Sequence, residues 1–486
     1  MAIHQERVLN YNLAVGLFVV LAVLHCLAAT MVTVHVLLRK RDVRSAIAWI
    51  GVAWLSFGFG AALYFVFGIN RVIRRAARIG RRATMRKAQV ATQTGTMEIA
   101  NLSRNIASIA RVGELTTGFP LTAGNRLSIF RGGDEAYPAM LEAIGSAKRS
   151  IAFASYMFRA DAVGLSFVAA LTKAKSRGVE IRVLVDGVGS GYPYSPIARH
   201  LAAAGITHAA FLQHWLPWRM TFLNMRNHKK LLIVDGAVGF TGGLNIGMEN
   251  VVAEHPRHPV DDVHFRLDGS VVRQLMVTFA EDWQFTTRET LSGDLWWPRV
   301  PAAGSMLAHG ISSGPDEDIG VLASILATAI GEAEHHVRIV TPYFLPDQTL
   351  NACIVLAALR GIEVDIVVPD RSDHRPLDWA MRAHLALLAA PGINIHLSPA
   401  PFDHSKLMTV DGSWCLLGSA NWDVRSSRLN FEFNVACYDR DSAAAMDKLI
   451  DQKISGSRRI SGTELAQRGM AIRLRDAAAR LMLPYL

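Results

Sequence analysis

The chain has 486 residues, of which 51% are hydrophobic, and a formal net charge of +10 at pH 7. This length suffices for two lobes and additional segments. The four cysteines lack paired spacing, and the sequence contains neither a carboxylate cluster nor a Gly-x-x-x-x-Gly-Lys loop, which argues against a disulfide framework, a metal site and nucleotide hydrolysis. We therefore expect a protein that needs no cofactor.

Two apolar stretches without charged residues dominate the N-terminal part of the chain. Residues 13–38 form the first, in which His25 and His35 are the most polar members, and residues 45–67 form the second. Each is long enough to cross the hydrocarbon core of a bilayer as a helix, and the first is too long for a cleaved signal peptide. We predict two transmembrane helices within residues 1–70.

Basic residues follow both stretches. The larger cluster has eight arginines and lysines between residues 71 and 87, and it predicts that the N-terminus and the rest of the chain are cytoplasmic. The cluster either attracts anionic headgroups, by about 1 kcal/mol per charge, or is only a topology signal. Residues 71–118 are predicted to form a basic juxtamembrane helix and a polar linker. Four basic residues between the two stretches oppose the predicted orientation: Arg39, Lys40, Arg41 and Arg44.

The remaining chain contains one pattern of elements twice. In residues 119–300, buried strands alternate with helical segments and lead to a hairpin near residue 230, and residues 301–486 repeat this order. Gly178 and Gly361 mark equivalent helix ends. Strands that alternate with helices imply a sheet flanked by helices. We predict an α/β fold of two pseudo-symmetric lobes, which meet about a pseudo-two-fold axis at one cleft.

Each hairpin carries the same short motif. In the first half the motif is His228, Lys230 and Asp235, followed by Asn245. Alternate residues of a strand point to the same face, so the histidine and the lysine lie side by side while Lys229 points away. An imidazole can attack phosphorus or donate a proton near neutral pH, and an ammonium group neutralises phosphoryl oxygens. The motif therefore predicts chemistry on a phosphate ester.

The second half repeats the motif with His404, Lys406 and Asp411, followed by Asn421. Two copies with the same downstream asparagine are improbable by chance, and we expect Asn245 and Asn421 to bind the substrate phosphate. Each aspartate of the motif precedes a glycine. It is therefore either a member of the catalytic site or a turn residue that binds its own backbone.

These residues make the chain similar to the phospholipase D superfamily, and within it to the bacterial cardiolipin synthases, over nearly the whole length. Residues 226–230 (RNHKK) resemble the first motif of the family, and residues 429–432 (LNFE) resemble the stretch after its second motif. Two places depart from the family pattern: Ser155, where an acidic residue is common, and residues 401–403.

The resemblance implies a phosphatidyl transfer in two displacements. One histidine attacks the lipid phosphorus, and the other protonates the departing alkoxide and then deprotonates the incoming alcohol. By resemblance, His228 is the nucleophile and His404 the acid and base, although the symmetry of the motifs leaves this order open. Lys230, Lys406 and the two asparagines stabilise charge on the phosphoryl oxygens.

Two carboxylates are expected to orient the histidines. A histidine that reacts through one nitrogen needs its other nitrogen held, usually by a carboxylate. Glu432 lies among apolar residues just after the second motif, and Asp262 precedes the corresponding strand of the first lobe. We expect each carboxylate to bind the histidine of its own lobe.

Two further segments of the chain leave alternatives open. Residues 214–222 mix aromatic and basic side chains, which favours a membrane interface for Trp215 and core packing for Phe222. Residues 470–486 have a basic helical pattern, and they contact either the membrane or the second lobe.

The leading functional hypothesis is the joining of two phosphatidylglycerol molecules, which gives cardiolipin and glycerol. The alternatives are hydrolysis or exchange onto another alcohol, and a membrane-anchored nuclease of the same superfamily. The apolar N-terminus favours an anionic phospholipid over nucleic acid as the partner. We predict a multi-pass protein of the inner (cytoplasmic) membrane with cytoplasmic lobes. A homo-oligomer is compatible with the sequence, which does not specify an oligomeric state.

Overall fold

The computed structural model of the protein describes residues 2–40, 43–68, 99, 102–192, 194–213, 225–315, 320–388 and 391–481. The chain divides into two compact units, Met1–Arg75 and Ala76–Leu486, which are described separately below. The basic cluster at residues 71–87 and the aromatic segment with Trp215 and Phe222 lie outside the described residues.

The first unit is helical. The helix α1 (Ala2–Arg39) contains the stretch from Tyr11 to Arg39, which is the one described helix long and apolar enough to cross a membrane. The second predicted spanning helix is wrong as a continuous element. Residues 43–68 instead form α2 (Val43–Leu55), α3 (Phe59–Leu63) and the π-helical turn η1 (Tyr64–Gly68).

Two glycines explain the break in the second apolar stretch. Gly58 has φ of 65°, a left-handed conformation that glycine adopts without steric cost. A side chain at Gly60 would place its Cβ 2.0 Å from the carbonyl oxygen of Val52, so only glycine permits the close return of the chain. The chain therefore reverses after Leu55, and the stretch folds as a short helical hairpin.

The second unit is built on one large sheet, and its strand order shows the duplication directly. From β1 outward the first lobe has the order β1, β9, β7, β6, β2, β3, β4, and from β10 outward the second has β10, β19, β17, β16, β11, β13, β14, with β20 added at the edge. β1 pairs with β10 in antiparallel fashion and joins the lobes. The strands of the first lobe are β1 (Thr122–Arg131), β2 (Ser150–Ser155), β3 (Glu180–Asp186), β4 (His208–Phe211), β6 (Leu231–Val234), β7 (Val238–Gly242) and β9 (Val263–Asp268). Those of the second are β10 (Met306–Ser313), β11 (His336–Val340), β13 (Glu363–Pro369), β14 (Ile393–Ser398), β16 (Leu407–Val410), β17 (Trp414–Gly418), β19 (Asn430–Tyr438) and β20 (Arg458–Ile460).

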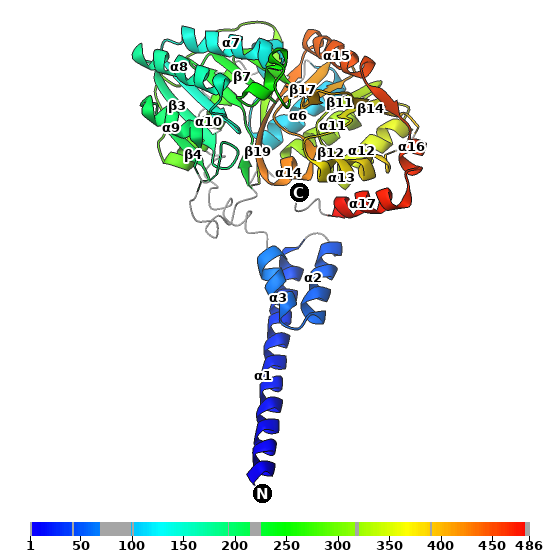
Figure 1. Ribbon diagram of the computed structural model, residues 1–486. Helices are drawn as coiled ribbons and strands as arrows, with labels where there is room; N and C mark the ends of the chain where they lie inside the picture. The colour runs from blue at the N-terminus through cyan, green and yellow to red at the C-terminus, as the bar shows by residue number, and fades with distance from the viewer. Residues whose placement is uncertain are drawn as a thin grey trace. The chain divides into compact units, whose positions relative to one another are not determined.

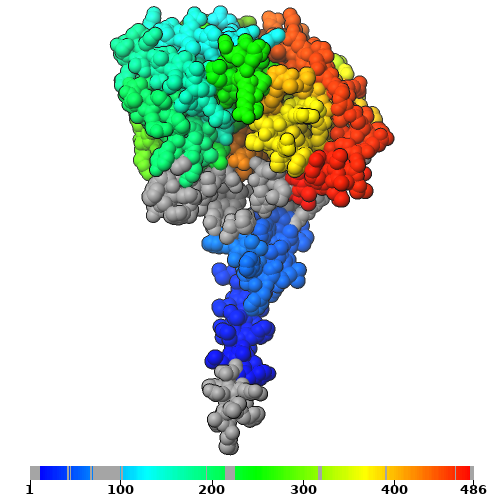
Figure 2. Space-filling view, in the orientation of Figure 1, coloured from blue at the N-terminus to red at the C-terminus, as the bar shows by residue number. Residues whose placement is uncertain are grey.

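Helices cover the sheet in both lobes, and the predicted two-lobed α/β fold is confirmed (Figure 1). In the space-filling view the first lobe, cyan to green, lies directly against the second, yellow to red (Figure 2). Phe153, Phe167 and Phe240 anchor the core of the first lobe, and Phe344 and Trp414 that of the second. The helices are α7 (Gly132–Ser146), α8 (Ala162–Ser176), α9 (Pro196–Ala203) and α10 (Val272–Thr287), then α11 (Val321–Gly331), α12 (Gln348–Leu359), α13 (Arg375–Leu385), α14 (Val424–Arg428), α15 (Arg440–Ser455), α16 (Gly462–Ala466) and α17 (Met470–Leu481).

Part of the predicted linker is an ordered helix of the second lobe. Residues 104–117 form α6 (Arg104–Thr117), whose Ile106 and Ile109 are buried in the core that α11 also lines. The amphipathic pattern of this segment was not recognised from the sequence, because its buried face has no aromatic residue and consists of isoleucine, alanine, glycine and threonine.

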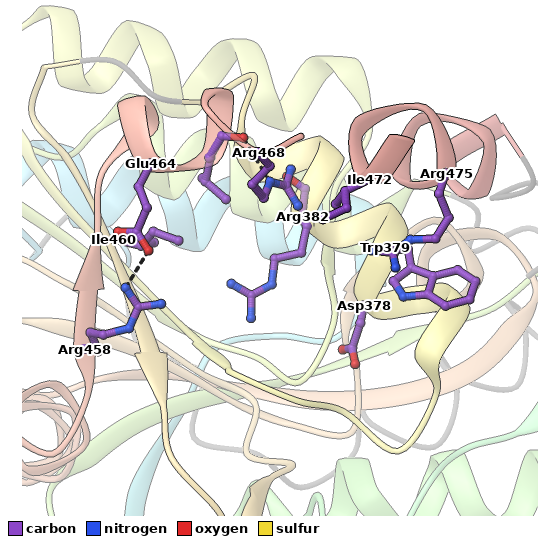
Figure 3. Close-up of a pocket in the computed structure, with 10 residues that line it drawn as sticks. Asp378, Trp379, Arg382, Arg458, Ile460, Glu464, Arg468, Ile472 and Arg475 are labelled. Carbon is purple, nitrogen blue, oxygen red and sulfur yellow. Dashed lines mark hydrogen bonds and ion pairs between the residues drawn. The ribbon is translucent and has the colours of Figure 1, made fainter. Parts of the chain in front are cut away.

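The C-terminal basic helix α17 contacts the second lobe, which resolves one alternative left open by the sequence. The guanidinium of Arg475 lies 4.5 Å from the ring centre of Trp379 in α13. A pocket of about 320 Å³ lies between α13, β20, α16 and α17, and arginines contribute much of its lining (Figure 3). These arginines have acidic partners: Arg458 binds Glu464, and both Arg468 and Arg475 bind Asp476. Neither motif histidine lines this pocket.

Candidate active site

Two short strand pairs between the lobes position the motif histidines. β5 (Arg226–Asn227) of the first lobe pairs with the start of β19, and the backbone N–H of His228 donates to the carbonyl of Phe431 at 2.9 Å. β15 (Phe402–Asp403) of the second lobe pairs with β8 (Val260–Asp261), and the N–H of His404 donates to the carbonyl of Asp261 at 2.7 Å. Each histidine is therefore held by a strand of the opposite lobe.

The residue that follows each of these carbonyls is the predicted orienting carboxylate. Nδ1 of His228 lies 3.0 Å from Oε2 of Glu432, and Nδ1 of His404 lies 2.8 Å from Oδ2 of Asp262. Asp262 and Glu432 thus both contact a motif histidine. The expectation that each binds the histidine of its own lobe is wrong, because the strand pairs place each histidine beside the carboxylate of the other lobe.

The Glu432 carboxylate has further partners that the sequence did not reveal. The hydroxyl of Ser419 donates to Oε2 at 2.6 Å, and Nδ2 of Asn430 donates to Oε1 at 3.0 Å. The carbonyl of Ser419 also lies 3.2 Å from Nδ1 of His228. The ring of Tyr156 packs at 4.8 Å from the His228 ring. Ser419 was visible only as one of the small residues before Asn421, and no spacing rule pointed to its hydroxyl.

The motif lysines lie beside the histidines as predicted. The motifs are not part of a strand, however, because residues 228–230 connect β5 to β6 and residues 404–406 connect β15 to β16 (Leu407–Val410). Nζ of Lys230 donates to the carbonyl of His228 at 2.8 Å, and Nζ of Lys406 contacts both the carbonyl and Nδ1 of His404, the latter at 2.9 Å. Lys229 points the other way and forms a buried ion pair with Asp282 at 2.7 Å.

Burial and mutual charge shift the pKa values of the site. Burial lowers the pKa of the His228 imidazole to about 4, although Glu432 opposes the shift. Burial also lowers the pKa of Lys230 to about 7 and that of Lys406 to about 8. The pKa of His404 is lowered as well, first by burial and then by the charge of Lys406. Both imidazoles are consequently neutral near pH 7 in the absence of substrate.

The two carboxyl groups respond in the opposite way. Burial alone would raise the pKa of Asp262, but the charge of Lys406 and the bond to His404 outweigh it and hold the pKa below its usual value. For Glu432 burial is outweighed in the same manner by His228, and its pKa is also lowered. Both groups are therefore carboxylates, which can stabilise a neighbouring imidazolium.

The motif aspartates serve the turns. Asp235 and Asp411 have φ of 52° and 51°, and both lie at the far end of the strand that follows the motif. The Asp235 carboxylate accepts backbone N–H bonds from residues 148–150, and the Asp411 carboxylate accepts them from residues 334–336. These contacts correct their predicted place among the reacting groups: each aspartate ties its hairpin to the start of the neighbouring strand.

The two asparagines lie in equivalent turns but differ in their contacts. Oδ1 of Asn245 accepts the N–H of Met157 at 3.3 Å, so a bond from Asn245 to a phosphate would come from Nδ2. Nδ2 of Asn421 lies 3.5 Å from Oδ2 of Asp423. Among the described residues, Oδ1 of Asn421 is buried without a hydrogen-bond partner. Their predicted phosphate contact stays a prediction.

Comparison with known families agrees with this geometry. The sequence profile described as "Cardiolipin synthase, PLD-like domain" matches residues 140–283 and 326–454, which is more than half of the chain and includes both motifs. The chain belongs to this family. The two matched segments correspond to the two lobes, each with one histidine and one lysine of the site.

Curated members of the cardiolipin synthase family cover nearly the whole chain. The cardiolipin synthase of Oceanobacillus iheyensis is 30% identical over 93% of this chain and 95% of its own length. Cardiolipin synthase 1 of Bacillus anthracis is 29% identical over 97% of this chain and 95% of its own length. The likeness therefore includes the N-terminal apolar stretches as well as the lobes.

A solved structure supports the fold of this family member. The phosphatidylserine synthase of Haemophilus influenzae Rd KW20 superposes with a TM-score of 0.61, covering 78% of this chain and all of that one at 15% identity. In the described part of the chain, no group of three or more His, Cys, Asp or Glu side chains is arranged to hold a metal ion.

Proposed function

We propose that this protein is a cardiolipin synthase that transfers a phosphatidyl group from one phosphatidylglycerol to another. The single observation that carries the proposal is the site between the lobes, where each motif histidine binds a carboxylate of the other lobe. It joins two histidines, each bound to a buried carboxylate, with two buried lysines. Two imidazoles with separate carboxylates suit a reaction that needs a nucleophile and a proton carrier at once.

In the first displacement, Nε2 of His228 attacks the phosphorus of the donor lipid. The bond from phosphorus to the glycerol headgroup oxygen breaks, and His404 protonates that oxygen, so glycerol leaves. The product on the protein is a phosphatidyl group bound to Nε2 of His228. Lys230 and Lys406 neutralise the phosphoryl oxygens as negative charge grows on them.

In the second displacement, the headgroup of another phosphatidylglycerol supplies the acceptor hydroxyl. His404, now neutral, takes the hydroxyl proton while the oxygen attacks phosphorus, and the bond from phosphorus to Nε2 of His228 breaks. The product is cardiolipin, and His404 has regained the proton that the next cycle needs. Atoms and protons balance over the two steps, with glycerol as the other product.

The charge of the substrate prepares His404 for its role. Without substrate His404 is neutral, because burial and the charge of Lys406 lower its pKa. A bound phosphodiester brings one negative charge, which offsets the lysine and raises the tendency of His404 to hold a proton. Asp262 at 2.8 Å stabilises the resulting imidazolium. Protonation of the general acid is thus coupled to arrival of the lipid.

We infer that the protein is anchored in the cytoplasmic membrane with its lobes on the cytoplasmic side. The apolar stretch of α1 and the eight basic residues between positions 71 and 87 support this placement. Anionic phospholipid is accordingly the proposed partner, and nucleic acid is not.

Hydrolysis, or exchange onto another alcohol, is the alternative, because both share the first displacement. The test is to reconstitute the full chain in vesicles with labelled phosphatidylglycerol alone and to identify the products. We expect cardiolipin and glycerol in equal amounts. Phosphatidic acid with glycerol would instead identify a hydrolase, and the absence of any lipid product would overturn the proposed function.

A further inference from the structure

Residues 43–68 form a short hairpin that packs beside α1, and the chain begins and ends this hairpin near the C-terminal end of α1. Trp54, near the end of α2, contacts His25 of α1, whereas Tyr64 of the returning turn η1 contacts His35. His25 and His35 are about 15 Å apart along α1, since a helix rises about 1.5 Å per residue. The chain thus runs down beside α1 through α2 and climbs back through α3 and η1 (Figure 1).

The hairpin is too short to cross a bilayer. α2 has 13 residues, which gives a length of about 20 Å. The hydrocarbon core of a bilayer is about 30 Å thick. The tip, residues 56–58, lies at the level of His25, and that level is about 21 Å from Arg39 along α1. With Arg39 at the membrane surface, the tip passes the midplane and stops short of the far side.

Two backbone groups at the helix break bond to α1. Nε2 of His25 lies 3.2 Å from the carbonyl oxygen of Trp54, and the N–H of Gly58 donates to Nδ1 of His25 at 3.2 Å. One neutral tautomer, with its proton on Nε2, satisfies both. The indole N–H of Trp54 donates to the hydroxyl of Thr33 at 3.0 Å. In hydrocarbon an unsatisfied backbone group costs several kcal/mol, so this bonding suits a tip inside the membrane.

The outward surface of the hairpin fits lipid chains. Residues 45–67 contain no charged side chain. The large apolar side chains that face outward include Ile47, Leu55, Phe59 and Phe65, with Leu55 88% exposed. A surface of this kind in water would be strongly unfavourable, whereas hydrocarbon is its natural surrounding.

The placement of charge favours the same topology. Two full spans would leave the four basic residues between positions 39 and 44 on the side opposite the larger cluster at 71–87. A hairpin that returns to its side of entry puts both clusters on one face. The positive-inside rule then acts in a single direction for all of them.

We propose that α1 crosses the membrane once and that α2, α3 and η1 form a re-entrant hairpin in the hydrocarbon, capped at its tip by His25. The segment before Tyr11 and the catalytic lobes therefore lie on opposite sides of the membrane. This replaces the two-span, same-side topology predicted from the sequence. The inference does not depend on which reaction the lobes catalyse.

Single cysteines test this topology in the full chain. Cys26 is exposed and Cys353 is half-buried, so both are first replaced by serine. Cys415 and Cys437 are buried and are left in place. One cysteine is then introduced in each of three variants, Gln5→Cys, Lys40→Cys and Leu115→Cys, of which Leu115 is an exposed residue of α6. Sealed vesicles of either orientation are treated with a membrane-impermeant maleimide. Reaction after detergent treatment, and retained lipid turnover, show that each variant is reactive and folded.

We expect Lys40→Cys and Leu115→Cys to react from one side and Gln5→Cys only from the other. Two full spans would give a different pattern, in which positions 5 and 115 react together and position 40 reacts from the opposite side. That result overturns the re-entrant hairpin. Reaction of all three from one side overturns the single span of α1 as well. Neither result bears on the product assay, so topology and proposed function fail separately.

Discussion

The two halves of the active site are built on the same plan but hold their histidines differently. Nδ1 of His228 faces two acceptors, Oε2 of Glu432 and the carbonyl of Ser419. Its proton must therefore lie on Nδ1, which leaves the lone pair on Nε2. Nδ1 of His404 faces an acceptor, Asp262, and a donor, the ammonium of Lys406. The protonation of His404 is consequently not fixed by its neighbours.

This difference favours one assignment of roles over its mirror image. A nucleophile benefits from a fixed tautomer with a free lone pair, and His228 has that arrangement. An acid and base must gain and lose a proton in each cycle, and His404 lies between groups of opposite charge, the Asp262 carboxylate and the Lys406 ammonium. The contacts thus distinguish two histidines that the repeated motif left equivalent.

Loss of either histidine should have the largest effect. We expect His228→Ala to abolish turnover and His404→Ala to reduce it by about 10²–10⁴-fold, the usual contribution of a general acid or base. With phosphatidyl-p-nitrophenol as donor, whose leaving group needs no proton, His404→Ala should still release nitrophenol while His228→Ala should not. Release by His228→Ala with none by His404→Ala would reverse the assignment.

Variants of the two carboxylates should give different results in the same assay, because each carboxylate acts through the histidine of the other lobe. Asp262→Asn should follow His404→Ala, with slow turnover of phosphatidylglycerol and rapid release of nitrophenol. Glu432→Gln should follow His228→Ala and be slow with both donors. We expect losses of about 10²-fold or more, since a lost carboxylate leaves the histidine in the wrong tautomer or unsupported. The opposite pattern would mean that each carboxylate serves its own lobe.

The pH dependence should show the low pKa of His228 and the depressed pKa values of the lysines. In the free enzyme His228 gains a proton as pH falls through about 4, and Lys230 and Lys406 lose theirs as pH rises through about 7 and about 8. We therefore expect kcat/KM to be greatest between the pKa of His228 and that of Lys230, in the mildly acidic range, and to decline on both sides. Lys406→Arg, which cannot lose its charge, should lessen the alkaline decline. A flat curve up to pH 10 would contradict the role given to the lysines.

A smaller effect is expected at Ser419. Its hydroxyl binds Glu432, whereas Asp262 has no equivalent serine beside it. The equivalent position in the first lobe is Gly243, where a Cβ would lie 2.2 Å from Oδ1 of Asp262. Ser419→Ala removes the bond to Glu432, and a bond to a charged group contributes about 1.5–3 kcal/mol. We expect about a 10-fold loss of kcat with little change in KM. Unchanged kcat would show that Glu432 is held in place without the bond from Ser419.

The smallest effect on chemistry is expected at the motif aspartates. Asp235→Ala removes three backbone hydrogen bonds and puts alanine at φ of 52°. The expected result is a loss of about 1–3 kcal/mol of stability and a lower Tm, with kcat of the folded fraction nearly unchanged. Asp235→Asn, which tolerates the left-handed conformation, is the control. A loss of kcat at full stability would return Asp235 to the catalytic group.

Local patterns predicted the two lobes and the place of each motif lysine beside its histidine. The expected alternation placed His228 beside Lys230 and turned Lys229 away, although these residues connect β5 to β6 and lie in neither strand. The repeat was enough to predict the mirrored sheet. The crossed pairing of carboxylates was beyond these patterns. It depends on which strands meet between the lobes, β5 with β19 and β15 with β8, and pairing between distant segments leaves no local periodicity.

The N-terminal stretches show a second limit. Residues 45–67 are one continuous apolar stretch, and its length alone led to the prediction of a spanning helix. Gly58 and Gly60 reverse the chain within that run, but glycine is frequent enough in membrane helices that its presence did not predict a turn. The decisive partner, His25, belongs to another helix.

The exchange of short strands between the lobes also bears on biosynthesis. β5 and the carbonyl of Phe431 must meet before His228 is held, and β15 and the carbonyl of Asp261 must meet before His404 is held. A nascent chain that has folded only its first lobe therefore exposes one histidine without its carboxylate and one carboxylate without its histidine. We therefore expect activity only after both strand pairs have formed, so that an incomplete chain would not react with the surrounding lipids.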